Sequence, residues 1–317
     1  MSLRKFWLPS LFSLTTVVVT TALPAAPPAA NPADVSRLAT YRKPSGEAYY
    51  ALSVQPKLVD TSEAGRDIVV LFDTSASQTA SYREDGLIAL RSLLDGLQDN
   101  DRVRIVAVDL TAAPLQDSFG AANSETVEGA LRKLDARVPL GSTDMVGALK
   151  AAATSFDGQS KNAKSVIYIG DGVSRGRLLG SPQLASVTGM LAEKRISVTS
   201  YAVGPQVNVP LLAALANQTG GLVVSDPEQK VSAQQVGARL AASVRATVAW
   251  PTKAELPEAL QKPLPGTVPP LRSDRDTVLI GRLAEGDLSS LKVTVEVSGK
   301  TTNVEVPIQA EDSNEDF

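Results

Sequence analysis

Short apolar runs alternate with helical patterns through the middle of the chain. Ile68 to Phe72 is a continuous apolar run, rich in β-branched residues, of the length that a strand buried on both faces needs. It stops at Asp73, and apolar residues spaced by three and four then predict a helix over residues 87–97. The same alternation of strand and helix patterns continues as far as Val244. It predicts an α/β fold with a doubly wound, mostly parallel sheet of the Rossmann-like kind.

The pattern changes after Trp250. Prolines are frequent in residues 249–273, which we interpret as a linker. Residues 274–310 then alternate apolar and polar positions with a period of two, which predicts a small β-rich accessory domain of three strands. Three strands make a thin sheet, so we expect a further predicted strand within residues 47–58 to join them.

The two ends of the chain predict export and solvated segments. Arg4 and Lys5 precede an apolar stretch and a group of small residues, which is typical of a secretory signal peptide over residues 1–25. An uncleaved membrane anchor is the alternative. We expect a periplasmic, cell-surface or extracellular protein with no membrane span in the mature chain. Residues 26–46 are interpreted as a disordered linker, and residues 311–317 as a solvated acidic tail.

Composition excludes several kinds of chemistry. The chain has 317 residues with no cysteine and no histidine. Disulfides, thiol catalysis, cysteine-ligated zinc and every histidine-based catalytic or metal site are therefore absent. Its 31 Lys and Arg are outnumbered by 34 Asp and Glu, giving a net charge of −3. Since the basic residues are also scattered, the chain has no sequence signature of nucleic-acid binding.

Oxygen-bearing side chains recur in loops at or beside the carboxyl ends of predicted strands. Asp73, Ser75 and Ser77 follow the first of these strands, Thr143 lies in a later loop, and Asp171 follows the strand at 165–169. Open α/β sheets bind ligands at this edge. One carboxylate and two hydroxyls in the first loop are hard oxygen ligands that suit Mg²⁺ or Mn²⁺. For the first loop alone, capping of the next helix is the alternative interpretation.

These motifs closely resemble the metal-ion-dependent adhesion site of von Willebrand factor type A domains. The family's D-x-S-x-S motif reads here as residues 73–77, its threonine loop as 141–144, and its last aspartate as Asp171. One departure is Gly170, where the family more often has a polar residue. The resemblance implies a type A domain over residues 62–248. It also implies metal ligation by Asp73, Ser75, Ser77, Thr143 and Asp171.

The resemblance further implies a function without catalysis. The cation would be Mg²⁺ in the first place, with Mn²⁺ or Ca²⁺ as alternatives, and the partner would be a protein that offers an Asp or Glu carboxylate. Two rivals remain: a structural module of an envelope complex whose metal is incidental, and a metal-dependent phosphoesterase that uses Asp73 and Asp171. Residues 172–176 match the G-x-S-x-G pattern of hydrolases, but the chain has no histidine to serve as general base. The sequence does not fix the oligomeric state.

Overall fold

The computed structural model describes residues 35–58, 64–177, 180–226 and 230–310. The predicted signal peptide and the predicted acidic tail lie outside these residues. Among the described residues, no helix combines the length and the apolar character that crossing a membrane requires.

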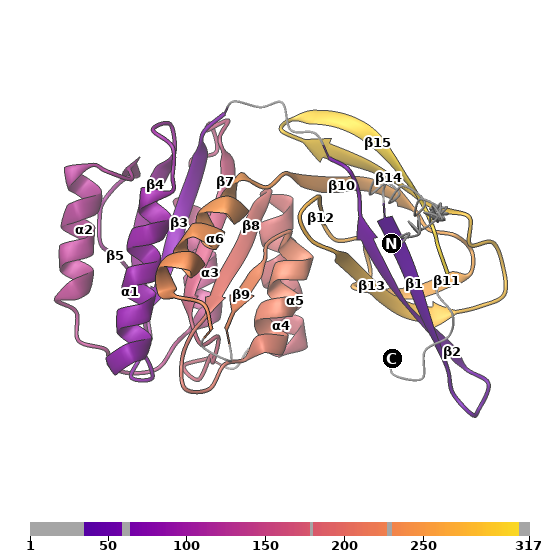
Figure 1. The fold of residues 1–317 in the computed structure, drawn as a ribbon, viewed down its shortest axis with the longest axis horizontal. Helices are drawn as coiled ribbons and strands as arrows, with labels where there is room; N and C mark the ends of the chain where they lie inside the picture. Colours follow the sequence, from indigo (N-terminus) through magenta and orange to yellow (C-terminus); the bar gives the residue numbers. More distant parts are fainter. Residues whose placement is uncertain (1–34, 59–63, 178–179, 227–229, 311–317) are drawn as a thin grey trace, which may run out of the picture. The chain divides into compact units, whose positions relative to one another are not determined.

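A central sheet with seven strands organises the middle of the described chain (Figure 1). Its path runs in the order β5-β4-β3-β7-β8-β9, and β6 pairs with β4 beside β5. Every pairing among β4, β3, β7, β8 and β9 is parallel, while β5 and β6 are antiparallel to β4. The strands are β3 (Arg66–Asp73), β4 (Arg102–Val108), β5 (Ala112–Pro114), β6 (Gly120–Ala121), β7 (Ala163–Gly170), β8 (Ile196–Ala202) and β9 (Val223–Ser225).

Helices cover both faces of this sheet. Along β3, Ile68 and Val70 share one buried cluster with residues of α1, α2 and α6, whereas Val69 and Leu71 share a second cluster with residues of α3, α4 and α5. Alternate side chains of a strand point to opposite faces, so the run Ile68 to Phe72 of β3 must be apolar at every position. This arrangement confirms the predicted α/β fold. The helices are α1 (Ala80–Asp95), α2 (Glu125–Asp135), α3 (Met145–Ser155), α4 (Ser181–Glu193), α5 (Val209–Thr219) and α6 (Ala233–Arg245).

Local signals in the sequence fix where several helices begin and end. Ser124 starts α2 by accepting a hydrogen bond from the backbone N–H of Val127. Ser232 and Gln235 form a reciprocal capping box at the start of α6. At its other end, α5 stops at Gly220, whose φ of 69° lies in the left-handed region that glycine adopts at low cost.

The accessory part is a sandwich of two antiparallel sheets with four strands each. One sheet has the order β1-β2-β13-β11 and the other the order β12-β10-β14-β15. Leu38, Leu52 and Leu279 of the first sheet pack with Leu271 and Val293 of the second in one buried cluster. The strands are β1 (Val35–Arg42), β2 (Ala48–Gln55), β10 (Val248–Glu255), β11 (Leu260–Leu264), β12 (Leu271–Arg272), β13 (Thr277–Leu283), β14 (Ser290–Val297) and β15 (Lys300–Pro307).

The accessory sandwich corrects three expectations from the sequence. Residues 35–42, assigned to a disordered linker, form β1, because Leu38 enters the core and the strand pairs along its whole length with β2. Residues 249–273, assigned to a linker, contribute to β10, β11 and β12, since their prolines are accommodated beside irregular pairing, as at Pro251 and Pro263. The C-terminal strands do not share one sheet: β2 pairs with β13, whereas β14 and β15 belong with β10.

Candidate metal centre

Backbone hydrogen bonds bring the loop after β3 against its neighbours. The amide of Thr74 donates to the carbonyl of Val108 at the end of β4, over 2.7 Å. The amide of Leu140 donates to Thr74 O over 2.9 Å, and the amide of Ala76 donates to Gly141 O over 3.1 Å. The loop that carries Asp73, Ser75 and Ser77 is therefore bound to the loop that carries Thr143.

All five predicted ligand residues lie together in one hydrogen-bonded group. Thr143 Oγ1 lies 3.1 Å and 3.0 Å from the two carboxylate oxygens of Asp73. Ser75 Oγ lies 3.0 Å from Ser77 Oγ, and Ser77 Oγ donates to Asp171 Oδ2 over 2.6 Å. The three loops thus gather two carboxylates and three hydroxyls at the carboxyl edge of the parallel sheet.

The two carboxylates of this group are buried and have no cationic partner among the described residues. Asp73 is 0% exposed and Asp171 is 3% exposed. Burial raises the pKa of Asp73, and the charge of Asp171 raises it further, although hydrogen bonds from Ser75 and Tyr168 act against both. No Lys or Arg of the described residues forms an ion pair with either carboxylate. A buried carboxylate is costly unless a cation or several donors compensate it, so this donor set fits a divalent cation.

Tyr168, which the sequence did not single out, and Gly170 shape the position of Asp73. The hydroxyl of Tyr168, on β7, donates to Asp73 Oδ2 over 2.8 Å and accepts from the amide of Gly172 over 3.1 Å. Burial and the charges of Asp73 and Asp171 raise the pKa of Tyr168 well above its ordinary value, so the phenol stays a donor. A Cβ on Gly170 would lie 2.5 Å from Asp73 Cβ and 2.6 Å from the Tyr168 hydroxyl. A side chain at Gly170 would therefore displace both groups.

A tyrosine within the apolar run of residues 166–169 was the available signal for Tyr168. Its side chain is fully buried, and a buried hydroxyl needs a hydrogen-bond partner. The sequence alone does not show that the partner is Asp73.

The helix-capping interpretation of the first loop is not supported by the structure. The residue before α1 is Thr79, and its side chain forms no capping hydrogen bond. Asp73 Oδ1 instead accepts from the amide of Ser75 over 2.9 Å, within its own loop. Asp144, next to Thr143, is the residue that caps a helix: its carboxylate accepts from the amide of Gly147 over 2.9 Å at the start of α3.

Ser174, the serine of the G-x-S-x-G pattern, holds the loops together. Its hydroxyl accepts from the amide of Met145 over 3.1 Å and donates to the carbonyl of Arg177 over 2.5 Å. The side chain is buried at 8% exposed. Because its hydrogen bonds are occupied by backbone groups, it pins the threonine loop rather than presenting a nucleophile.

Exposed apolar side chains lie in segments that are hydrogen-bonded to the loops of the candidate metal centre. The large exposed hydrophobic residues of the α/β part are Leu110, Val138, Leu140 and Val209. Each is next to a group bonded to the three loops: Leu110 follows Asp109, whose carbonyl accepts from Asp144, and Val209 follows Asn208, whose amide donates to Asp171 O. Leu140 itself donates to Thr74, and Val138 follows Arg137, whose guanidinium donates to the Thr74 hydroxyl. We call these four residues the apolar rim.

In comparisons with known proteins, residues 66–225 match the von Willebrand factor type A domain family. No curated protein matches the chain. Among solved structures, "von Willebrand factor type A from Catenulispora acidiphila" is similar at 15% identity over 89% of this chain and 71% of that one, with a TM-score of 0.56. The ArnB paralog VWA2 from Sulfolobus acidocaldarius is similar at 16% identity over 83% of this chain and 71% of that one, with a TM-score of 0.50. At these identities the likeness is one of fold.

Proposed function

This chain belongs to the von Willebrand factor type A domain family, and from that premise we propose that it binds a protein partner through a divalent cation. Domains of this family often mediate contacts between proteins, and many of them bind such a cation. The proposed ligands are Asp73, Ser75, Ser77, Thr143 and Asp171. Mg²⁺ is the proposed cation, with Mn²⁺ or Ca²⁺ as alternatives.

The observation that carries the proposal is the buried pair of carboxylates with three hydroxyls bonded beside them. Thr143 Oγ1 lies within hydrogen-bond distance of Asp73, and Ser77 Oγ bonds to both Ser75 Oγ and Asp171. The backbone amide of Ser75 donates to Asp73 and so connects the two groups. Two carboxylates balance the charge of a divalent cation, and neutral hydroxyls add oxygen ligands without adding charge. Since Mg²⁺ favours six oxygens, five side chains would leave a position for an outside ligand.

The residues of the site have separate tasks in this proposal. Asp73 and Asp171 supply negative charge, and the hydrogen bonds from Ser75 N, Val173 N and the Tyr168 hydroxyl hold their oxygens in place. The bound cation would supply the positive charge to which an Asp or Glu carboxylate of the partner binds. Among the described residues, no Lys or Arg pairs with Asp73 or Asp171 and could supply that charge instead.

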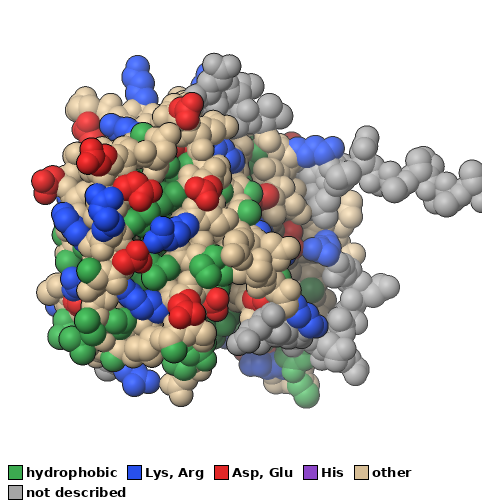
Figure 2. Space-filling view, turned by 60° about the vertical axis from the view of Figure 1, so that its left-hand side comes forward, with side chains coloured by type: hydrophobic (Ala, Val, Ile, Leu, Met, Phe, Trp, Pro, Cys, Tyr) green, Lys and Arg blue, Asp and Glu red, His purple; other side chains and the backbone are tan. Residues whose placement is uncertain are grey.

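The apolar rim supports a protein as the partner. Leu140 and Val138 are 66% and 68% exposed, and both belong to the loop that leads to Thr143. Apolar side chains around a central polar contact are typical of protein interfaces. On the face of the α/β part that Figure 2 shows, basic and acidic side chains are intermixed.

We propose that the protein is exported from the cytoplasm and that it is not an enzyme. The predicted signal peptide is the basis for export to the periplasm, cell surface or medium. Hydrolysis would need a general base or an activated nucleophile near the metal. The chain has no histidine or cysteine, and Ser174 is bonded to backbone groups. A structural role in an envelope complex, with an incidental metal, remains the rival within the same fold.

Calorimetric titration of the full chain with Mg²⁺ and Mn²⁺ tests the metal centre. We expect one site per chain, lost in Asp73→Ala and retained in the matched control Asp117→Ala, because Asp117 is an exposed aspartate away from the three loops. Ser75→Ala and Thr143→Ala remove neutral oxygens and should weaken binding less than Asp73→Ala. Equal affinity in the wild type and Asp73→Ala would reject the ligand assignment.

Affinity capture from the native envelope tests the partner. Recovery of a partner protein with Mg²⁺ present, and its loss both with EDTA and in Asp171→Ala, is the expected result. A partner that is retained with EDTA would favour the structural module. Phosphoesterase turnover above background that disappears in Asp73→Ala would overturn the proposed function.

A further inference from the structure

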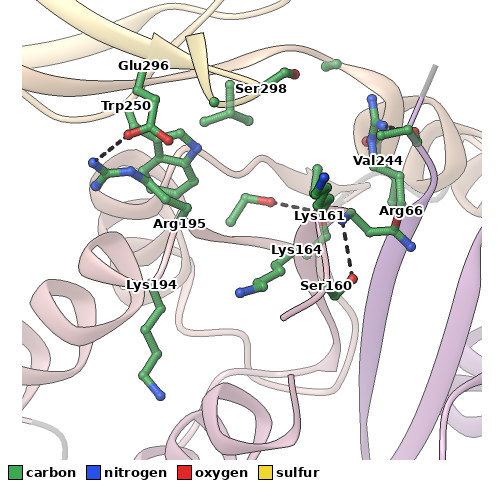
Figure 3. A pocket seen from close by; sticks show the side chains of 18 of the residues that line it. Arg66, Ser160, Lys161, Lys164, Lys194, Arg195, Val244, Trp250, Glu296 and Ser298 are labelled. Carbon is green, nitrogen blue, oxygen red and sulfur yellow. Dashed lines mark hydrogen bonds and ion pairs between the residues drawn. The ribbon is translucent and has the colours of Figure 1, made fainter. Parts of the chain in front are cut away.

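A cavity of about 400 Å³ lies at the amino edge of the parallel sheet, the edge opposite the candidate metal centre (Figure 3). Its walls come from the starts of β3, β7 and β8, from the ends of α4 and α6, and from β10 and β14 of the sandwich. The volume is that of a small-molecule site, which typically spans about 300–1,000 Å³. None of the residues proposed as metal ligands lines it.

Positive charge is concentrated in this cavity. Five cationic side chains line it, and Glu296 is the one acidic residue among its lining. The whole chain, by contrast, has a net charge of −3. The cations are Arg66, Lys161, Lys164, Lys194 and Arg195.

Three of these cations interact with other groups of the protein, so their presence in the cavity needs no ligand to account for it. Arg66 donates to the carbonyl of Val244 at the end of α6, and Lys194 donates to the carbonyl of Ala153 in α3. Arg195 donates to Ala192 O and pairs with Glu296 over 3.2 Å, while its guanidinium lies over the ring of Trp250 at 5.8 Å. Carbonyls at helix ends attract such cations, so these residues alone would not indicate a ligand.

Lys161 and Lys164 are the two cations of the cavity for which the described residues provide no partner. In the described part of the chain, neither ammonium group has a hydrogen-bond or ion-pair partner. Lys164 is only partly exposed, and Figure 3 shows it projecting between the Arg195–Trp250 pair and Arg66. A partly buried ammonium group without a partner carries a desolvation cost that a bound anion would offset.

A pair of buried hydroxyls adds a neutral donor to the same wall. Ser165 Oγ and Ser197 Oγ lie 3.0 Å apart at the starts of β7 and β8, and neither has another hydrogen-bond partner among the described residues. One hydroxyl hydrogen is used between the two oxygens. The other is therefore available to an oxygen atom of a ligand.

We propose that this cavity binds a phosphate-bearing small molecule, with Lys161 and Lys164 as the principal contacts and the Ser165–Ser197 pair as a hydroxyl donor. A phosphate group accepts several hydrogen bonds on its oxygens and carries more than one negative charge, which matches two free ammonium groups and a free hydroxyl better than a single carboxylate does. The cavity is large enough for an organic group attached to that phosphate. The inference does not depend on the proposed metal centre.

Trp250 provides the measurement, because it lines the cavity and the chain has two tryptophans. In the full chain with Trp7→Phe, tryptophan emission reports on Trp250 alone. The probe is inorganic pyrophosphate in EDTA, which removes divalent cations from solution. We expect a saturable emission change that weakens at high salt, and an affinity for citrate lower by about tenfold or more.

Variants of the free lysines decide the proposal. Lys164→Gln and Lys161→Gln should each weaken pyrophosphate binding by about tenfold, the loss expected for a charge-assisted hydrogen bond. Lys150→Gln, at an exposed lysine of α3 outside the cavity, should leave it unchanged. Calorimetry repeats the comparison without relying on Trp250. No saturable binding of pyrophosphate, or equal binding in Lys161→Gln, Lys164→Gln and the wild type, would overturn the proposal.

Discussion

At the scale of single residues, the candidate metal centre depends on a buried phenol as much as on its ligands. The Tyr168 hydroxyl fixes one oxygen of Asp73 and is itself fixed by the amide of Gly172. Second-layer hydrogen bonds of this kind orient a ligand before the metal arrives. They also lower the cost of keeping Asp73 ionised in a buried place.

Replacing Tyr168 with phenylalanine tests this role. Tyr168→Phe should weaken Mg²⁺ or Mn²⁺ binding by about tenfold, because one hydrogen bond to a charged group is lost. The matched control is Tyr201→Phe on β8, since the Tyr201 hydroxyl forms no hydrogen bond among the described residues. Calorimetry gives the affinities and circular dichroism checks the fold. Unchanged affinity in Tyr168→Phe would show that the phenol only fills space.

Asp67 should give the protein a stability that depends on pH. Burial alone would raise the pKa of Asp67, but hydrogen bonds from Arg102, Asn162 and Ser160 outweigh it, so the pKa is lowered. Arg102 holds both carboxylate oxygens, at 2.8 Å and 2.7 Å. A carboxyl group whose pKa falls on folding stabilises the folded state above its unfolded pKa of about 4, and this stability disappears as the pH drops through the folded pKa.

Asp67→Asn should remove that part of the pH dependence. Between pH 7 and pH 3, the free energy of unfolding in urea should fall less for Asp67→Asn than for the wild type. The control is Asp117→Asn, because Asp117 is exposed. Identical slopes for Asp67→Asn and the wild type would contradict the assigned role.

The sequence predicts that the five candidate ligands lie together. It does not predict the hydrogen bond of Tyr168 that holds Asp73 in place. The three loops could be grouped because parallel strands end at one edge, a property of the fold class. Tyr168 could not be assigned, because its hydroxyl meets Asp73 only through the pairing of β3 with β7 and their relative register. Contacts that depend on register are not visible in residue spacing.

At the scale of elements, the accessory sandwich is built from segments that precede and follow the α/β part in the sequence. β2 pairs along its length with β13, and β1 pairs with β2. This hairpin contributes Leu38, Tyr50, Leu52 and Val54 to a buried cluster whose other members come from Ala249 onward. The sandwich therefore needs strands that lie far apart in the sequence.

Deleting residues 1–58 should destabilise the sandwich and spare the central sheet. Hydrogen exchange should become faster in β13, which loses a pairing partner over seven positions, and also in β14 and β15 as the shared core opens. Exchange in β3 and β7 should stay slow. Unchanged protection of β13 after the deletion would show that the sandwich core is stable without the hairpin.

Strands with strong apolar periods were predictable, and their distribution between sheets was not. Alternation in β14 and β15 shows one apolar face for each strand. Prolines in β10 and β11 argued for a linker, yet Pro251 pairs opposite Val295 and Pro263 lies at a shift of register. Tertiary pairing overrides the local preference of proline at such positions.

At the scale of the whole described chain, a buried arginine joins the sandwich to the α/β part. Arg272 on β12 is 1% exposed, and it donates to Gly220 O after α5 and to Ser243 O in α6. Asp274 holds the same guanidinium with two hydrogen bonds of 2.6 Å and 2.7 Å. Asn217 adds a reciprocal pair of hydrogen bonds to the backbone of Val278.

Arg272→Met keeps much of the side-chain volume and removes these bonds. We expect the free energy of unfolding to fall by about 2–4 kcal/mol, because buried carbonyls lose their donor and Asp274 loses its cation. Arg282→Met, at an exposed arginine paired with Glu47, should cost less than about 1 kcal/mol. Chemical denaturation measures both. A loss in Arg272→Met no larger than in Arg282→Met would remove Arg272 from this role.

The split construction of the sandwich sets an order in time. During synthesis, residues 35–55 leave the ribosome before β10 to β15 exist, so the hairpin must wait while the whole α/β part is made. In that interval Leu38, Tyr50 and Leu52 have no opposite sheet, and the free edge of β2 is open to pairing with another chain. The last strands to be synthesised thus complete a core that the first ones began, and the nascent chain needs protection until they arrive.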